Sequence, residues 1–97
     1  MYTYLGCYID GPISSLSLQI ISNAVEMTME MCFGHCLSHG MTYGGVGTKI
    51  ICGCGNAVTN LQDNDEACDN RCPGNDAQIC GGLARTSVFE IRSKYLP

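Results

Sequence analysis

Cysteine is the residue type with the clearest chemistry in this sequence. The 97 residues include eight cysteines, an even number. In a short chain, a cysteine set of this density is typical of a disulfide framework, although the count alone does not fix the pairing. The Cys-x-Cys and Cys-x3-Cys spacings could also supply thiolates to zinc. The dispersal of the cysteines and the absence of a Cys-x2-Cys pair favour disulfides, so we expect neither a metal nor a cofactor.

Other polar residues have spacings that only partly match known sites. His35 and His39 lie four residues apart, as in helical metal sites, but the sequence places no third ligand beside them. The acidic segment 63–69 lacks the glycine and the final glutamate of an EF-hand loop. No Ser-His-Asp arrangement, paired-carboxylate motif or phosphate-binding loop is recognisable. We therefore expect a protein that is not an enzyme.

Composition and charge argue against two large classes of function. Charged residues make up 14% of the chain, and nine acids against five bases give a formal net charge of -4. Such an acidic chain is poorly suited to binding nucleic acid. The longest apolar runs are far shorter than the roughly 18 residues that a membrane-spanning helix needs. We expect no nucleic-acid partner and no membrane insertion.

The first half of the chain predicts a strand, a loop and a helix. Residues 2–9 are rich in aromatic and β-branched residues and are followed by a turn at Asp10-Gly11-Pro12. Residues 14–22 have no clean periodicity and predict a loop with a short strand. The helix has Thr28 as its predicted N-cap, Glu30 in its first turn and Gly40 as its left-handed C-cap.

The second half predicts strands separated by polar connections. Residues 41–54 predict two short strands of one sheet around a glycine-rich connection. Residues 56–76 predict an irregular loop that needs disulfides to be ordered. Residues 84–91 predict a closing strand, and 92–97 predict a tail. We expect one domain over residues 2–91.

The predicted helix and one predicted strand carry cysteines at matching separations. Cys32 and Cys36 lie one helical turn apart, about 6 Å along the axis. Cys52 and Cys54 point to the same face of a strand and lie about 6.6 Å apart. Two adjacent disulfides could therefore join the helix to this strand, and the spacing leaves open which cysteine pairs with which.

From end to end, the sequence resembles the WSC domain. The resemblance covers about residues 4–89 and includes all eight cysteines. Its motifs are Tyr-Leu-Gly-Cys-Tyr-Ile-Asp at 4–10, Met-Thr-x-Glu-x-Cys-x3-Cys at 27–36, Tyr-x-Gly at 43–45, Cys-x-Cys-Gly-Asn at 52–56, Asp-Ala-Gln-Ile-Cys-Gly-Gly at 76–82 and Ser-Val-Phe at 87–89. It implies a small disulfide-rich α+β fold, PAN/apple-like, with one main helix packed on a short antiparallel sheet and four disulfides. It also implies a secreted or cell-surface protein, typically fungal.

The resemblance implies a particular disulfide pairing. The implied bridges are Cys7 with Cys68, Cys32 with Cys52, Cys36 with Cys54, and Cys72 with Cys80. Two of these four bridges agree with the helix-to-strand disulfides that the cysteine separations allow.

The resemblance further implies a carbohydrate-binding function without catalysis. The implied partner is a cell-wall polysaccharide such as β-1,3-glucan or xylan, and the alternative is an extracellular protein-interaction or structural domain. Relatives usually carry one aromatic residue near Thr48 and another at the position of Gly53, and this sequence lacks both. Other rings would then have to stack on sugar. Retention on solid polysaccharide would depend on avidity from tandem copies or self-association.

Sugar recognition needs flat apolar faces for the C–H side of a ring and planar polar groups for its hydroxyls. Tyr4 and Tyr8 are expected to share one face of the first strand and to form the best platform. Phe33 and Phe89 are expected in the core. The candidate carbohydrate-binding residues are Tyr4, Tyr8, Tyr43, Asn56, Asp76 and Gln78.

Overall fold

The computed structural model describes residues 2–10 and 16–91. In chain order its elements are β1 (Tyr2–Ile9), β2 (Gln19–Ser22), α1 (Met29–Ser38), β3 (Tyr43–Gly47), β4 (Ile51–Gly55), β5 (Gln62–Asp63), the 3-10 helix η1 (Asp65–Ala67), β6 (Arg71–Cys72), β7 (Asn75–Ile79) and β8 (Arg85–Ile91). The predicted turn at Gly11-Pro12 and the predicted tail over 92–97 lie outside the described residues.

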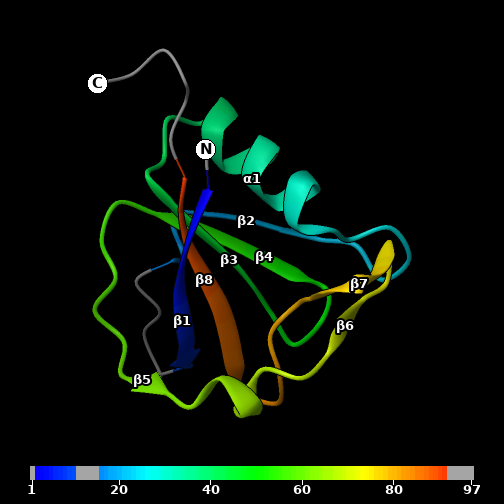
Figure 1. The fold of residues 1–97 in the computed structure, drawn as a ribbon. Coiled ribbons are helices and arrows are strands. Elements are labelled where there is room, and N and C mark those ends of the chain that lie inside the picture. Colours follow the sequence, from blue (N-terminus) through cyan, green and yellow to red (C-terminus); the bar gives the residue numbers. More distant parts are fainter. Residues whose placement is uncertain (1, 11–15, 92–97) are drawn as a thin grey trace.

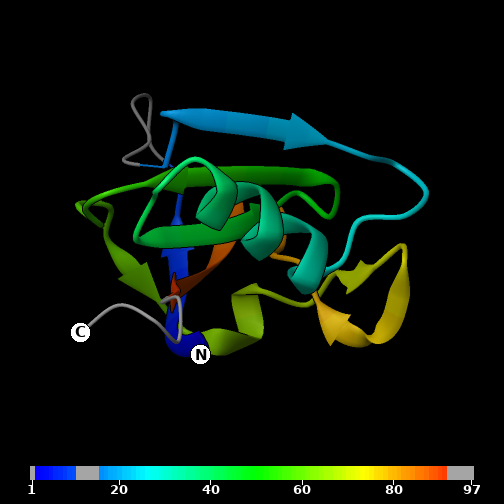
Figure 2. The same ribbon diagram turned by 90° about the horizontal axis from the view of Figure 1, so that it is seen from above.

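Six strands form one antiparallel sheet in the order β2-β4-β3-β8-β1-β5 (Figure 1). β1 pairs with β8 along its length, from Tyr2 opposite Ile91 to Ile9 opposite Arg85. β6 and β7 form a separate hairpin. Figure 2 shows α1 lying across β3 and β4, the two strands against which it packs. The expected α+β arrangement, one helix on an antiparallel sheet, is confirmed.

Local signals define both ends of α1, as the sequence predicts. The Thr28 Oγ1 accepts a hydrogen bond from the Met31 N–H at 3.0 Å, which satisfies one of the free amides of the first turn. Glu30 places a carboxylate in that turn, where the helix dipole favours negative charge. At the other end Gly40 has φ +72°, and its N–H donates to the Leu37 carbonyl at 3.0 Å.

The predicted glycine-rich connection over 41–54 is wrong in its position. The glycines lie inside β3, and the chain reverses at Thr48 and Lys49, which have φ values of 50° and 77°. At Gly44 the reason is the close approach of α1, because a Cβ there would lie 2.9 Å from the Cys36 Sγ. At Gly45 and Gly47 the crowding comes from β8, where a Cβ would lie 2.6 Å from the Ser87 carbonyl oxygen and 2.7 Å from the Thr86 Oγ1. Glycine in this strand therefore permits close packing against both α1 and β8, and the turn is made by two residues in the left-handed region.

The expected irregular loop over 56–76 contains short regular elements. β5, η1, β6 and the start of β7 all fall within it. Two disulfides hold this region, one joining Cys7 to Cys68 and one joining Cys72 to Cys80. The expected closing strand over 84–91 is confirmed as β8.

Four disulfides connect the elements, and they confirm the pairing that the resemblance implies. α1 is joined to β4 by Cys32–Cys52 and Cys36–Cys54, with Cα–Cα distances of 5.3 and 5.4 Å. The similar distances show that one helical turn and two strand residues match in length. All eight cysteines are paired.

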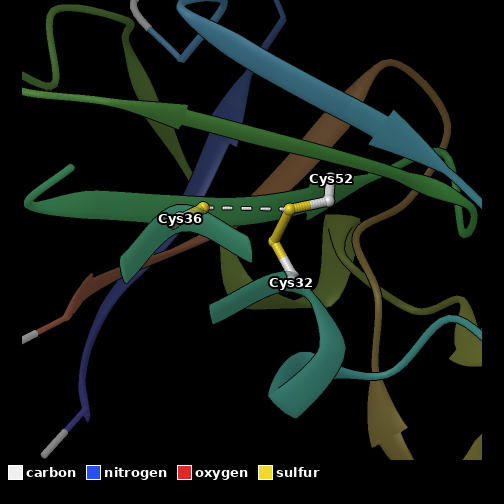
Figure 3. A group of neighbouring side chains, drawn as sticks. All are labelled: Cys32, Cys36 and Cys52. Carbon is white, nitrogen blue, oxygen red and sulfur yellow. Dashed lines mark hydrogen bonds between the residues drawn. A yellow bond between two sulfur atoms is a disulfide. The ribbon is translucent and has the colours of Figure 1, made fainter. Parts of the chain in front are cut away.

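The two helix-to-strand disulfides bring three sulfur atoms together, as Figure 3 shows for Cys32, Cys36 and Cys52. The dashed line marks an Sγ–Sγ approach of 3.9 Å between Cys36 and Cys52. Because both sulfurs belong to disulfides, neither carries a hydrogen, and the approach is a van der Waals contact. The same pairing leaves no thiolate in this group to bind a metal.

The hydrophobic core lies between α1 and the sheet. Besides cysteines it contains Met27, Phe33, Val46 and Ile91, each almost fully buried. Phe89 is partly buried and packs against this cluster. The expected core positions of Phe33 and Phe89 are thus confirmed, with Phe89 at the margin of the core.

Candidate functional site

α1 covers only part of the sheet face on which it lies. On the same face, β1 and β8 continue beyond the helix, and η1 and β7 border the area that remains (Figures 1 and 2). A cavity of about 520 Å³ opens there. Its lining residues are Tyr2, Tyr4, Met29, Glu30, Phe33, Asp65, Cys68, Gln78, Ile79, Ser87 and Phe89. The cavity is therefore the part of the sheet surface that a ten-residue helix is too short and narrow to cover.

Four aromatic rings form a continuous row through the cavity. Ring centroids are 4.4 Å apart for Tyr2 and Phe33, 4.9 Å for Phe33 and Phe89, and 5.1 Å for Phe89 and Tyr4. Tyr2 and Tyr4 are two residues apart on β1 and so project to the same side. They are 46% and 45% exposed, whereas Phe33 is 2% exposed. Two accessible rings thus rest on two rings held by the core.

Polar groups border the aromatic row, and their partners fix their positions. The Tyr4 hydroxyl donates to Asp65 Oδ1 at 2.8 Å. The Gln78 Oε1 accepts from the Met29 N–H at 3.0 Å, and its Nε2 donates to both carboxylate oxygens of Glu30 at 2.8 Å. Gln78 therefore ties β7 to the first turn of α1, beside which Figure 1 shows the β6–β7 hairpin.

The environment of Tyr4 keeps its hydroxyl protonated. Burial against the neighbouring ring, followed by the hydrogen bond to Asp65 and the charge of that carboxylate, raises the Tyr4 pKa from 10.0 to about 12. At ordinary pH the ring is neutral and acts as a donor to Asp65.

Two of the six predicted binding residues line this cavity. They are Tyr4 and Gln78, which come from opposite ends of the chain. Tyr43 begins β3 and is half-buried outside the cavity, and Asn56 accepts hydrogen bonds from the Thr42 N–H and Oγ1 at 3.3 and 3.4 Å. Asp76 is exposed in the β6–β7 hairpin and does not line the cavity. The structure does not bring these three together with Tyr4.

The expectation that Tyr4 and Tyr8 share a strand face is wrong. β1 pairs with β8 in a register that shifts between Tyr4 and Gly6, so Leu5 is an extra residue in the ladder. Such a β-bulge reverses the alternation of side chains beyond it. Tyr4 faces the cavity with Phe89, while Tyr8 lines a separate small hollow.

Several cavity residues were not among the sequence candidates. Tyr2 could have been found, because it lies two residues before Tyr4 on the same predicted strand. The sequence predicts Glu30 only as a carboxylate in the first turn of the helix, and no local signal marks Asp65. Asp65 lies three residues before Cys68, which is joined to β1 through Cys7. The sequence thus reveals the aromatic part of the site better than its polar border.

The opposite face of the sheet explains the missing aromatic at Gly53. This glycine lies opposite Ile20 of β2 and Gly45 of β3. A Cβ at this position would overlap the carbonyl oxygen of Leu16, because the chain leading into β2 passes directly over it. Gly53 is therefore a position where backbone packs on backbone, and no ring fits there.

Fold, disulfides and cavity together define a small disulfide-bonded α+β module with an aromatic surface site. The sequence model of the WSC domain matches residues 4–82. The chain therefore belongs to the WSC domain family, a family of non-catalytic domains.

Relatives of known name share this stretch of sequence. A WSC domain-containing protein of Arthroderma benhamiae is 31% identical over 96 residues, covering 92% of this chain and 10% of the relative. Kremen protein 2 of Mus musculus is 28% identical over 92 residues, covering 91% of this chain and 20% of the relative. The xylosyltransferase sqv-6 of Caenorhabditis briggsae is 34% identical over 102 residues, covering 96% of this chain and 13% of the relative.

The chain thus spans between a tenth and a fifth of the length of these three relatives. The similarity therefore concerns only a part of each relative's sequence. Within residues 2–10 and 16–91, none of the helices combines the length and apolar character needed to cross a bilayer.

Proposed function

We propose that this domain is an extracellular, non-catalytic carbohydrate-binding module that recognises cell-wall polysaccharide such as β-1,3-glucan or xylan. The observation that carries the proposal is the pair of exposed tyrosines, Tyr2 and Tyr4, in a cavity of about 520 Å³. Accessible rings on a rigid backing are suited to the apolar C–H face of a sugar.

The polar border provides partners for the hydroxyls of the same sugar. Asp65 accepts one hydrogen bond from Tyr4, and its carboxylate has further acceptor sites. Gln78 is held by Met29 and Glu30, which keeps its side chain in place before any ligand arrives. A ring stacked on Tyr4 can therefore place equatorial hydroxyls against groups whose orientation is already fixed.

The expected affinity for one chain of sugar is low. A single aromatic stack adds on the order of 0.5 to 1.5 kcal/mol beyond burial. We expect dissociation constants between about millimolar and high micromolar, or roughly 4 to 6 kcal/mol. Firm retention on insoluble polysaccharide then requires several domains acting together, through tandem copies or self-association.

The proposed extracellular location is supported by the four disulfides. Such bonds form and persist in oxidising compartments, and small secreted domains use them to supplement a limited core. WSC domains with these bridges are typical of secreted or cell-surface proteins.

Co-sedimentation with insoluble β-1,3-glucan, xylan and chitin tests the proposal. We expect the wild-type domain to pellet with β-glucan or xylan, and the Tyr2→Ala, Tyr4→Ala double variant to remain in the supernatant. Leu83→Ala is the matched control, because Leu83 is 86% exposed and lies outside the cavity. Failure of the wild-type domain to bind any of the three polysaccharides contradicts the proposal.

A second candidate function is protein interaction, and one observation favours it. Leu18, Ile20 and Ile51 are exposed beside one another, at the β2 edge of the sheet and on the adjoining strand β4. An apolar strip on an edge strand is suited to contact with another polypeptide. The Ile20→Ser variant separates the two sites in the same pelleting assay. If this variant pellets like the wild type and only the Tyr2→Ala, Tyr4→Ala variant does not, polysaccharide binds at the cavity and not at this strip.

A further inference from the structure

The charged side chains that line the cavity are all negative. Its lining contains two carboxylates, Glu30 and Asp65. No lysine, arginine or histidine is among the described residues that line it. The whole chain is also acidic, with a formal net charge of -4. A ligand entering the cavity therefore meets negative potential at its polar border.

Neutral groups satisfy both carboxylates. Asp65 is bonded to the Tyr4 hydroxyl, and Glu30 to the side-chain amide of Gln78. Within the described part of the chain, neither carboxylate forms an ion pair, whereas Asp63 outside the cavity is paired with Arg85 at 2.8 Å. Hydrogen bonds to neutral donors orient a carboxylate without cancelling its charge, so no basic side chain among the described residues neutralises the two carboxylates of the cavity.

The aromatic row also favours a positively charged ligand. A cation is attracted to the face of a tyrosine or phenylalanine ring by the ring quadrupole. Tyr2 and Tyr4 line the cavity, are 46% and 45% exposed, and contact Phe33 and Phe89. Carboxylates and ring faces thus favour positive charge at the same place.

We infer that this cavity prefers a polysaccharide of amino sugars with free, protonated amines, such as a β-1,4-linked glucosamine polymer, over a neutral glucan, xylan or N-acetylated chain. The inference rests on the proposed function, since it names the sugar class for the same cavity. The sugar ring stacks on Tyr4 or Tyr2, and its ammonium group lies toward Asp65 or Glu30. A neutral sugar makes the same stack but gains no ion pair.

The expected preference is moderate. A solvent-accessible ion pair and an exposed cation–π contact each contribute little alone, so together they predict binding about fivefold to thirtyfold tighter than for the neutral analogue. Because the charges are accessible, raising the salt concentration should reduce this ratio toward one.

Titration of the domain with a glucosamine hexamer and with its fully N-acetylated analogue tests the inference, at a pH where the free amine is protonated. The two ligands share ring and linkage and differ in charge. We expect the glucosamine hexamer to bind at least fivefold more tightly at low salt. Equal affinities, or tighter binding of the acetylated hexamer, would overturn the inference and leave the proposed function intact. Binding of neither ligand, nor of a β-1,3-glucan or xylan hexamer, would overturn both.

Two isosteric variants test whether Asp65 and Glu30 cause the preference for the glucosamine hexamer. Asp65→Asn and Glu30→Gln keep a carbonyl acceptor for their present partners while removing the charge. Each should lower the preference, and the double variant should bind both hexamers within about twofold of each other. Glu66→Gln is the matched control, because Glu66 adjoins Asp65 in η1 but does not line the cavity. A double variant that retains the full preference would place the cation elsewhere and overturn the assignment.

Discussion

At the scale of single residues, Tyr4 joins the exposed part of the cavity to other elements of the fold. Its ring packs on Phe89 of β8, and its hydroxyl bonds to Asp65 of η1. One side chain is thus held by strands and a helix that lie far apart in the sequence. The choice of Tyr4 as a candidate could be made from the sequence, because an aromatic residue on a first strand is visible there. Its partner could not, because a separation of 61 residues is bridged only in the folded chain.

The first prediction concerns the titration of Tyr4. We expect its ring resonances to titrate at a pKa of about 12, against an ordinary value of 10.0. Because the folded state holds this proton more tightly, Tyr4 contributes stability that is complete below pH 10 and is lost as the pH rises from 10 toward 12. In Asp65→Asn the pKa should fall but remain above 10, since burial is the largest cause of the shift.

An NMR pH titration of the tyrosine rings makes this measurement, with Tyr4 assigned by comparison with Tyr4→Phe. Titration of Tyr4 near 10 in the wild-type protein would contradict the expected rise in its pKa.

At the scale of elements, local and long-range signals differ in what they reveal. The ends of α1 could be predicted because Thr28 and Gly40 act within a few residues of themselves. The bulge at Leu5 has one local sign, a glycine inside the strand at Gly6 with φ +146°. Its other contact is distant in sequence, because the Gln62 side chain packs over Gly6 and donates to the Leu5 carbonyl at 3.4 Å. Because of that bulge, Tyr4 shares a strand face with Tyr2 and not, as the sequence predicts, with Tyr8. The alternation of an unbroken strand would have placed Tyr4 and Tyr8 together.

The second prediction compares two glycines in different elements. Gly34 lies in α1 with nothing within 4 Å of where its Cβ would be. Gly34→Ala should therefore stabilise the domain by about 0.5 to 1 kcal/mol through helix propensity. Gly53 lies in β4 beneath the Leu16 carbonyl, so Gly53→Ala should destabilise it by about 1 to 3 kcal/mol through overpacking.

Chemical denaturation of both variants at one pH measures these free energies of unfolding. The opposite signs serve as each other's control, since both substitutions add one methyl group. If Gly53→Ala were as stable as the wild type, the segment entering β2 would not lie over β4.

At the scale of the whole molecule, the disulfides hold together parts of the chain that a small core would bind only weakly. The sequence separations of the bridged cysteines are 61, 20, 18 and 8 residues. The helix-to-strand bridges could be anticipated from matching cysteine separations, and the remaining pairing from the family resemblance. The cavity could not be predicted, because it is the space left between α1, η1 and β7 once those bridges have formed.

The third prediction ranks the disulfides by the loops that they close. In the chain-entropy account, the Cys7–Cys68 bridge stabilises by about 4 kcal/mol and the Cys72–Cys80 bridge by about 2.5 kcal/mol, because the longer loop restricts the unfolded chain more. Replacing both cysteines of each pair with alanine and measuring the free energy of unfolding tests the ranking. A larger loss from the Cys72–Cys80 pair would show that local packing in the hairpin, and not loop closure, determines its contribution.

The oxidation state itself is measured by mass spectrometry after alkylation without reductant. We expect no labelled thiol in the folded protein, since all eight cysteines are paired. Removing the Cys32–Cys52 bridge alone should cost about 2 to 5 kcal/mol. Any alkylated cysteine in the native domain would contradict the framework.

The proposed function requires that sugar binds on the exposed rings of Tyr2 and Tyr4 in the cavity. Its most direct test is an NMR titration of the isolated domain with soluble β-1,3-glucan and xylan hexasaccharides, following the Tyr2 and Tyr4 ring resonances. We predict a dissociation constant between about millimolar and high micromolar for at least one ligand. Shifts should centre on Tyr2, Tyr4 and Gln78 and be absent in the Tyr2→Ala, Tyr4→Ala variant. Submicromolar binding, or unchanged affinity in that variant while it remains folded, would show that the site lies elsewhere.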